Sequence, residues 1–77
     1  MKTITIYSTP SCIYCKMAKE FFTANNVEYT DYDVATNEEK RNEMLEKTGQ
    51  MAVPVIDIDG EILIGFDKAK ISEILGL

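Results

Sequence analysis

Residues 5–22 read TIYSTPSCIYCKMAKEFF and contain a β-branched run, a proline and then two cysteines at the start of a helical pattern. Residues 2–7 alternate polar and apolar side chains, which predicts a strand that Pro10 brings to an end. The following residues predict a helix from about Cys12 to Ala24, because apolar side chains recur there at helical spacing. These apolar positions are Met17, Ala18, Phe21 and Phe22, and the two phenylalanines are expected to lie in the core.

The middle of the chain predicts a second strand and a second helix. Residues 27–34, VEYTDYDV, carry two alternating sets of strand-forming side chains. Thr36 and Glu39 fit the capping box that opens a helix, and this helix runs to about Thr48, where Gly49 stops it. Its apolar face is thin, so its acidic side chains are expected to form a solvated face made of Glu38, Glu39, Glu43 and Glu46.

The last third of the chain predicts a hairpin and a closing helix. Residues 53–58 and 61–64 are short apolar runs joined by an Asp-Gly pair, which is typical of a tight antiparallel turn. A final helix is expected from Asp67, its N-cap, to about Leu75.

The predicted element order, β-α-β-α-β-β-α, gives an α/β fold. A strand, a helix and a second strand cross over right-handedly, so the first two strands are expected to be parallel. The hairpin adds antiparallel strands, and the result is a four-stranded mixed sheet flanked by three helices, with helices on both faces. A chain of 77 residues fits one domain, residues 1–77.

Composition and charge restrict the kinds of partner. The chain is 45% hydrophobic and 27% charged, which is typical of a globular protein rather than a disordered one. Its net charge of −5 and its scattered basic residues argue against a nucleic-acid or anionic-membrane partner. The longest apolar runs fall far short of the ~20 residues that a membrane span needs, and the N-terminus lacks a signal peptide's apolar core. We therefore expect a cytoplasmic protein, and we expect it to be monomeric.

Cys12 and Cys15 are the only two cysteines, and their spacing leaves three uses open. As a staple they would close a loop of about four residues and add only about 2 kcal/mol, a small gain for a protein in a reducing compartment. As zinc ligands they would supply only two of the roughly four ligands that a structural zinc site needs. The chain has no His and no further Cys to complete such a site. A metal ion or iron–sulfur cluster shared between two chains stays as the alternative to a redox use.

The redox use accounts for both the spacing and the position of the pair. Residues at i and i+3 of a helix lie on one face with β-carbons about 5–6 Å apart, close to disulfide distance. Cys12 would lie at the helix N-terminus, where free N–H groups and the helix dipole stabilise a thiolate, and Cys15 would be more buried. We therefore predict Cys12 as the nucleophile and Cys15 as the resolving thiol. Because the chain has no His, it cannot form a Cys-His hydrolase.

Residues 5–22, together with residues 49–67, GQMAVPVIDIDGEILIGFD, resemble the glutaredoxin-like proteins of the thioredoxin superfamily. The resemblance extends over nearly the whole chain and implies a thioredoxin fold. It also implies a small thiol–disulfide oxidoreductase, an electron carrier that reduces protein disulfides or mixed disulfides with glutathione. It implies no tightly bound cofactor and no metal, with glutathione as one candidate reductant.

The resemblance assigns roles to residues outside the cysteine pair. In the family, the bond corresponding to Val53–Pro54 is cis and packs beside the active disulfide, and the backbone at Val53 pairs with the substrate. Tyr14 matches the tyrosine between the cysteines of the glutaredoxin motif. The N-terminus of the last helix, which receives part of glutathione in the family, corresponds to Gly65, Phe66 and Asp67.

Several positions differ from the usual glutaredoxin pattern. Ile13 replaces a proline between the cysteines. Thr9 stands where glutaredoxins usually carry a basic residue that contacts a glutathione carboxylate, and Gln50 stands where some relatives have another. Gly65-Phe66 instead resembles the NrdH-type redoxins, which take electrons from thioredoxin reductase. The resemblance therefore implies either glutathione or thioredoxin reductase as the electron donor.

Overall fold

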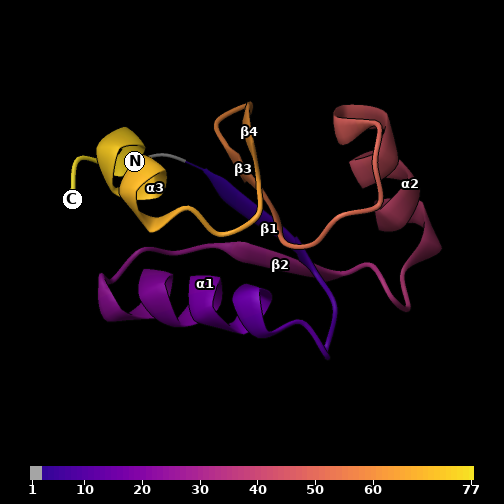
Figure 1. The fold of residues 1–77 in the computed structure, drawn as a ribbon, viewed down its shortest axis with the longest axis horizontal. Coiled ribbons are helices and arrows are strands. Elements are labelled where there is room, and N and C mark those ends of the chain that lie inside the picture. Colours follow the sequence, from indigo (N-terminus) through magenta and orange to yellow (C-terminus); the bar gives the residue numbers. More distant parts are fainter. Residues whose placement is uncertain (1–2) are drawn as a thin grey trace.

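The computed structural model describes residues 3–77 and confirms the predicted order of strands and helices (Figure 1). Lys2, which belongs to the predicted first strand, lies outside the described residues. Among residues 3–77, no helix is both long and apolar enough to cross a membrane. The elements are β1 (Ile4–Ser8), α1 (Ile13–Ala24), β2 (Thr30–Asp33), α2 (Glu38–Thr48), β3 (Val55–Ile58), β4 (Glu61–Ile64) and α3 (Lys68–Leu75).

The four strands form one mixed sheet in the order β2-β1-β3-β4, as predicted. β1 pairs with β2 in parallel and with β3 antiparallel, and β3 pairs with β4 antiparallel. Tyr7 lies in register with Tyr32 on one side and with Val55 on the other. This register brings the end of β1, which leads to Cys12, next to the start of β3, which follows Pro54. The segments that carry the cysteines and the Val-Pro pair therefore meet at one end of the sheet.

Apolar side chains cover both faces of the sheet in two clusters. Successive side chains of β1 point to opposite faces, so Ile6 faces α1 and α3 while Tyr7 faces α2. Figure 1 shows α1 and α2 on opposite sides of the strands and α3 beside the start of β1. The α1-side cluster consists of the buried residues Ile4, Ile6, Ala18, Phe22, Ile56, Ile58 and Ile71. The α2-side cluster consists of Tyr7, Val34, Met44 and Val55.

Three strands begin later than the sequence pattern predicts. β1 begins at Ile4, with Thr3 outside it, and ends at Ser8, one residue beyond the predicted end. β2 begins at Thr30 rather than Val27, because the Val27 N–H donates to the Phe22 carbonyl at 2.8 Å and closes the end of α1. β3 begins at Val55, two residues later than predicted. Pro54 precedes it and has no N–H group to donate to a neighbouring strand.

The ends of the helices agree with the predictions except at one cap. Asn37, not Thr36, caps α2, and its Oδ1 accepts the Lys40 N–H at 3.1 Å. The capping-box prediction is wrong because a turn, closed by the Asn37 N–H on a carbonyl of β2, carries the chain through Thr36. Asp67 caps α3 as predicted, and Gly49 ends α2 in the left-handed conformation with φ of 73°.

The β3–β4 turn has the geometry that its Asp-Gly sequence predicts. Asp59 and Gly60 both have positive φ, 51° and 94°, as a tight two-residue hairpin turn requires. Asp57 Oδ1 accepts the Gly60 N–H at 2.7 Å and fixes the turn from the side of β3. The hairpin prediction is therefore confirmed.

Candidate active site

Cys12 and Cys15 form a disulfide at the start of α1, with their Cα atoms 5.2 Å apart. Cys12 is the N-cap residue in an extended conformation, and the helix begins at Ile13. The Cys12 Sγ accepts a hydrogen bond from the Cys15 backbone N–H at 3.1 Å. A sulfur at this position faces the free N–H groups of the first turn and the positive end of the helix dipole, and both stabilise a thiolate. The predicted placement of the pair at the helix N-terminus is confirmed.

The two cysteines differ in their access to solvent. Cys15 is 1% exposed and lies in the core, whereas Cys12 is only half-buried. Ile13 and Tyr14, which stand between them, are 74% and 62% exposed. A disulfide on a large substrate can therefore reach Cys12 while Cys15 stays shielded. This is the asymmetry that the predicted roles of the two thiols require.

The loop before α1 holds Cys12 through backbone contacts. The Cys12 N–H donates to the Thr9 carbonyl at 3.2 Å, and the Cys12 carbonyl accepts the Lys16 N–H at 3.2 Å. The Thr9 carbonyl thereby closes the turn from β1 into α1, and Thr9 itself is half-buried. The contact of Thr9 with glutathione stays a prediction.

The Val53–Pro54 peptide bond is cis, as the resemblance implies. Pro54 is fully buried, and its carbonyl accepts the Gly65 N–H at 2.8 Å. Val53 is half-buried and packs against the α2-side cluster. Because Tyr7 and Val55 are in register, Val53 and Pro54 lie at the same end of the sheet as the disulfide. Both halves of the predicted site therefore lie at one end of the sheet, and their direct contact stays a prediction.

The remaining predicted site residues lie around this end of the sheet. The Phe66 ring turns toward α1, with its centroid 5.9 Å from that of Phe21, and it is half-buried against the α1-side cluster. Asp67 Oδ1 accepts a backbone N–H of α3 at 3.1 Å, and Gln50 is exposed directly after α2. The contacts of these three residues and Gly65 with glutathione stay predictions.

Within residues 3–77, no three or more His, Cys, Asp or Glu side chains come together in a way that could hold a metal ion. A metal ion or cluster at Cys12 and Cys15 would therefore need further ligands from outside residues 3–77.

A polar group that the sequence pattern did not single out ties α1 to the sheet. Ser8 is 1% exposed and donates its hydroxyl to Asp31 Oδ1 at 2.6 Å, and Lys19 binds the other carboxylate oxygen at 2.7 Å. Lys19 follows Cys15 by one helical turn, so this polar group contacts α1 one turn further along the helix than the cysteine pair. The signal was present in the sequence, because Ser8 continues the core-facing alternation of Ile6, and a buried hydroxyl needs a partner.

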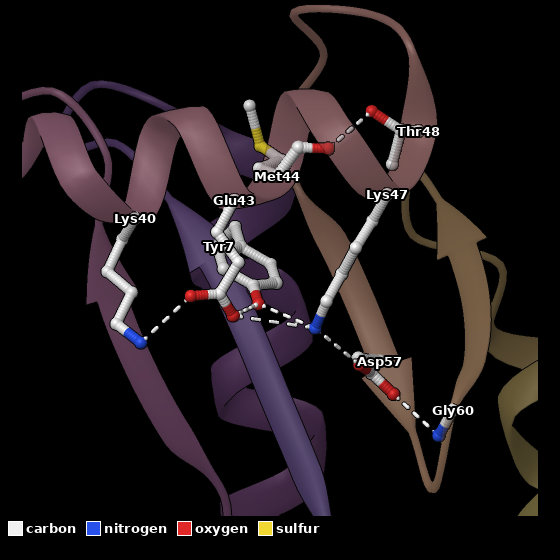
Figure 2. A network of polar contacts seen from close by, with 8 residues as sticks. All are labelled: Tyr7, Lys40, Glu43, Met44, Lys47, Thr48, Asp57 and Gly60. Atoms are coloured by element: carbon white, nitrogen blue, oxygen red, sulfur yellow. Dashed lines mark hydrogen bonds and ion pairs between the residues drawn. The ribbon is translucent and has the colours of Figure 1, made fainter.

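A second polar group joins α2 to the sheet, and Figure 2 shows it. Tyr7 donates its hydroxyl hydrogen to Glu43 Oε1 at 2.7 Å and accepts a hydrogen bond from Lys47 Nζ at 3.0 Å. Lys47 Nζ also binds Asp57 Oδ2 at 2.9 Å, and Lys40 Nζ binds Glu43 Oε2 at 3.0 Å. Glu43 is therefore a partner in this group, and the prediction that it belongs to a solvated acidic face is wrong.

These contacts shift the pKa values of the groups that make them. Hydrogen bonds from Tyr7 and Lys40 lower the pKa of Glu43 from 4.5 to about 2. Burial raises the pKa of Tyr7, and hydrogen bonds to Tyr7 and Asp57 raise the pKa of Lys47. Glu43 and Lys47 therefore carry opposite charges throughout the neutral pH range.

The lowered pKa of Glu43 predicts a contribution to stability that acid removes. This contribution is complete above pH 4.5, the ordinary pKa, and is lost as pH falls toward the folded-state pKa of about 2. We expect Glu43→Gln to have a lower free energy of unfolding than the parent protein at neutral pH. As pH falls from 4.5 to about 2, the variant should lose less of this free energy than the parent does. Urea unfolding at a series of pH values measures both effects. Glu46→Gln, which changes an exposed glutamate on the same helix, is the control. Equal slopes of unfolding free energy against acidic pH for the Glu43→Gln and parent proteins would contradict the prediction.

The comparisons of sequence and of structure with known proteins agree on one family. The sequence profile of the glutaredoxin family matches residues 4–63. A glutaredoxin-like 8.6 kDa protein from the rubredoxin operon of Clostridium pasteurianum is 44% identical over 72 residues, which cover 94% of this chain and 96% of that protein. The crystal structure of a mutant thioredoxin-like protein has a TM-score of 0.91 and 37% identity, and covers 99% of this chain and 97% of that one. The expected thioredoxin fold is thereby confirmed.

A more distant structure is a buckwheat glutaredoxin in complex with glutathione. It has a TM-score of 0.76 and 23% identity, and the match covers 97% of this chain and 71% of that one. At this identity the likeness concerns the fold, and the bound glutathione is a property of the buckwheat protein.

Proposed function

The chain belongs to the glutaredoxin family, and we propose that it is a thiol–disulfide oxidoreductase that works through a Cys12–Cys15 dithiol cycle. Its substrates are protein disulfides or mixed disulfides with glutathione, and it acts in the reducing environment of the cytoplasm. The observation that carries the proposal is the unequal placement of the two sulfurs. Cys12 is half-buried at the N-cap of α1, and Cys15 is 1% exposed in the first turn.

The cycle starts from the reduced pair. The Cys12 thiolate attacks one sulfur of the substrate disulfide, the substrate S–S bond breaks, and its other sulfur leaves as a thiolate that takes up a proton. Cys15 then loses its proton, and its sulfur attacks Cys12 Sγ. This step forms the Cys12–Cys15 disulfide and releases the second substrate sulfur as a thiol. Two electrons pass to the substrate, and the product is the oxidised protein, in which the two sulfurs are joined.

The start of α1 supplies what the first step needs. An ordinary cysteine thiol is only about 3% ionised at neutral pH, so an efficient nucleophile requires a stabilised anion. The Cys15 N–H already points at Cys12 Sγ, and a hydrogen bond to a charged group contributes about 1.5–3 kcal/mol. The helix dipole adds about 0.3–1 kcal/mol in favour of a negative charge at this end.

The docking surface is proposed to lie on both sides of the disulfide. The backbone of Val53, next to the buried Pro54, pairs with an extended segment of the substrate in the manner of an added strand. Exposed apolar side chains supply the contacts beside it, and they include Tyr14 at 62% exposure and Met51 at 61%. A substrate with apolar residues next to its disulfide fits this surface.

The electron donor is proposed to be glutathione or thioredoxin reductase. A glutathione site would use Thr9, Gln50, Gly65, Phe66 and Asp67, and the side chains of Thr9 and Gln50 carry no positive charge for the glutathione carboxylates. The Phe66 ring packs toward Phe21 of α1. This arrangement gives an apolar surface before α3 and favours a protein donor over a small anionic one.

The test is to oxidise the pure protein and to ask what reduces it. One sample receives NADPH, glutathione reductase and glutathione, and the other receives NADPH and thioredoxin reductase, with loss of the disulfide followed in both. Rapid reduction by either system supports the proposal and identifies the donor. Failure of both, with reductases from more than one source, would contradict the proposed function.

A further inference from the structure

Four side chains from three elements form what we call the α2 anchor: Tyr7 of β1, Glu43 and Lys47 of α2, and Asp57 of β3. In Figure 2, the Lys47 side chain descends from α2 and ends between the Tyr7 hydroxyl and the Asp57 carboxylate. Its Nζ lies 3.0 Å from the Tyr7 hydroxyl, 2.9 Å from Asp57 Oδ2 and 3.5 Å from Glu43 Oε1. One ammonium group therefore has partners on the helix and on two strands.

The α2 anchor leaves little freedom in how α2 sits on the sheet. Tyr7 is fully buried, so its hydroxyl needs partners within the protein, and Glu43 and Lys47 provide them. Glu43 and Lys47 are one helical turn apart, so both contacts are made only when this face of α2 points at the sheet. Met44 between them is fully buried, and it secures the same orientation by packing.

The C-terminal end of α2 transmits this orientation to the chain before Pro54. The Thr48 hydroxyl oxygen lies 2.9 Å from both the Met44 and the Gln50 carbonyl oxygens, so its one hydrogen can bond to either of them, and the oxygen accepts the Gln50 N–H at 3.2 Å. Gln50 is thus tied to the last turn of the helix. Three residues later, Val53 packs against the same cluster as Met44, and Pro54 is held by the Gly65 N–H.

We propose that the α2 anchor positions residues 50–54 for docking a protein disulfide and acts on the reaction only through that segment. Glu43, Lys47 and Asp57 are positioning residues in this scheme, because they lie on the α2 face of the sheet. The cysteine pair belongs to α1, which packs on the opposite face. The proposal rests on the proposed function, since it assumes that a substrate segment pairs with Val53.

This arrangement predicts a split between two kinds of substrate. A protein disulfide must pair with residues 50–54 to align its sulfur with Cys12, so misplacing the segment raises its KM. A small aromatic disulfide such as dithiobisnitrobenzoate needs only access to the Cys12 thiolate. Its rate should therefore depend on the start of α1 and not on the α2 anchor.

The experiment compares Lys47→Met with the parent protein and with Lys70→Met, which removes an exposed positive charge from α3. Insulin with its disulfides intact and dithiobisnitrobenzoate serve as the two substrate classes. In the insulin assay dithiothreitol regenerates the reduced protein and its uncatalysed rate is subtracted, whereas dithiobisnitrobenzoate is mixed with reduced protein from which dithiothreitol has been removed. For Lys47→Met, KM for the protein disulfide should rise about fivefold or more, while kcat and the small-disulfide rate stay within about twofold. Lys70→Met should change neither.

Tyr7→Phe provides a second variant, because it keeps the buried ring and removes only the hydroxyl that Glu43 and Lys47 share. If Lys47→Met fails to fold, this variant decides the question with the same expected split. Equal losses for both substrates, or no change for either, would overturn the proposal. A parent protein that reduces neither substrate would instead count against the proposed function, so the two failures are distinguishable.

Discussion

Replacing Cys12 with serine should abolish disulfide reduction, with a loss of about a thousandfold or more in turnover. The serine hydroxyl is not ionised at neutral pH and cannot displace a thiolate, so neither step of the cycle can start. The fold should persist, because Cys12 is the half-buried N-cap and serine is itself a good capping residue. The measurement is steady-state reduction of a protein disulfide, with far-ultraviolet circular dichroism to verify the fold.

Cys15→Ser is the matched control for this prediction. It keeps the nucleophile and removes the resolving thiol, so the protein should accumulate a mixed disulfide between Cys12 and the substrate. Mass spectrometry of the intact protein would detect one substrate molecule per chain. A Cys12→Ser protein with undiminished turnover, or a Cys15→Ser protein that forms no adduct, would contradict the assigned roles.

Replacing Phe22 with alanine should lower the free energy of unfolding by about 3–5 kcal/mol, a large part of the stability of a small domain. Phe22 of α1 is fully buried in the α1-side cluster, which also contains Ile71 of α3, and its ring lies 5.8 Å from that of Tyr29. Removing the ring leaves a cavity that the surrounding strands can fill only in part. Urea unfolding of the parent and variant proteins measures the difference.

Phe21→Ala is the control for the cavity argument. Phe21 precedes Phe22 on α1 but is only half-buried, with its ring against Phe66. Its loss should destabilise the protein by about half as much or less, because water can enter the space. A cost for Phe22→Ala below about 1 kcal/mol, or below that of Phe21→Ala, would contradict the placement of Phe22 at the centre of the core.

The features that the sequence predicts correctly are those with local causes. The Asp-Gly turn is predictable because both residues tolerate positive φ, and the start of α1 is predictable because the apolar spacing begins next to the cysteine pair. Asp67 as a cap follows from the same kind of local rule. The apolar spacing alone places the cysteines at a helix N-terminus without any knowledge of the sheet.

The features that the sequence does not predict depend on backbone turns between elements or on contacts between distant segments. Thr36 and Asn37 are both acceptable caps, and the turn after β2 decides in favour of Asn37. Glu43 looks like one member of an acidic helix face, and only the strand register brings the Tyr7 hydroxyl within 2.7 Å of it. The late start of β2 comes from a local turn, since the Val27 N–H donates to the Phe22 carbonyl at the end of α1.

The two polar groups near the candidate site lie on opposite faces of the sheet, and each holds a different helix. Ser8, Asp31 and Lys19 hold α1, which carries the reacting sulfurs. The α2 anchor holds the helix that leads to Val53. Each group connects a helix to the end of β1 that leads to Cys12, through Ser8 on one face and Tyr7 on the other. The scheme therefore separates reactivity, set at α1, from substrate alignment, set at α2.

The most direct test of the central claim is to ask which sulfur reacts first in the reduced parent protein. The protein is fully reduced, treated with a limiting amount of iodoacetamide at about pH 7, and digested for peptide mapping by mass spectrometry. The label should appear on Cys12, at a rate at least about tenfold above that of an unstructured cysteine peptide, and Cys15 should stay unlabelled. Equal labelling of both cysteines, or a Cys12 rate no higher than that of the peptide, would contradict an activated nucleophile at the N-terminus of α1.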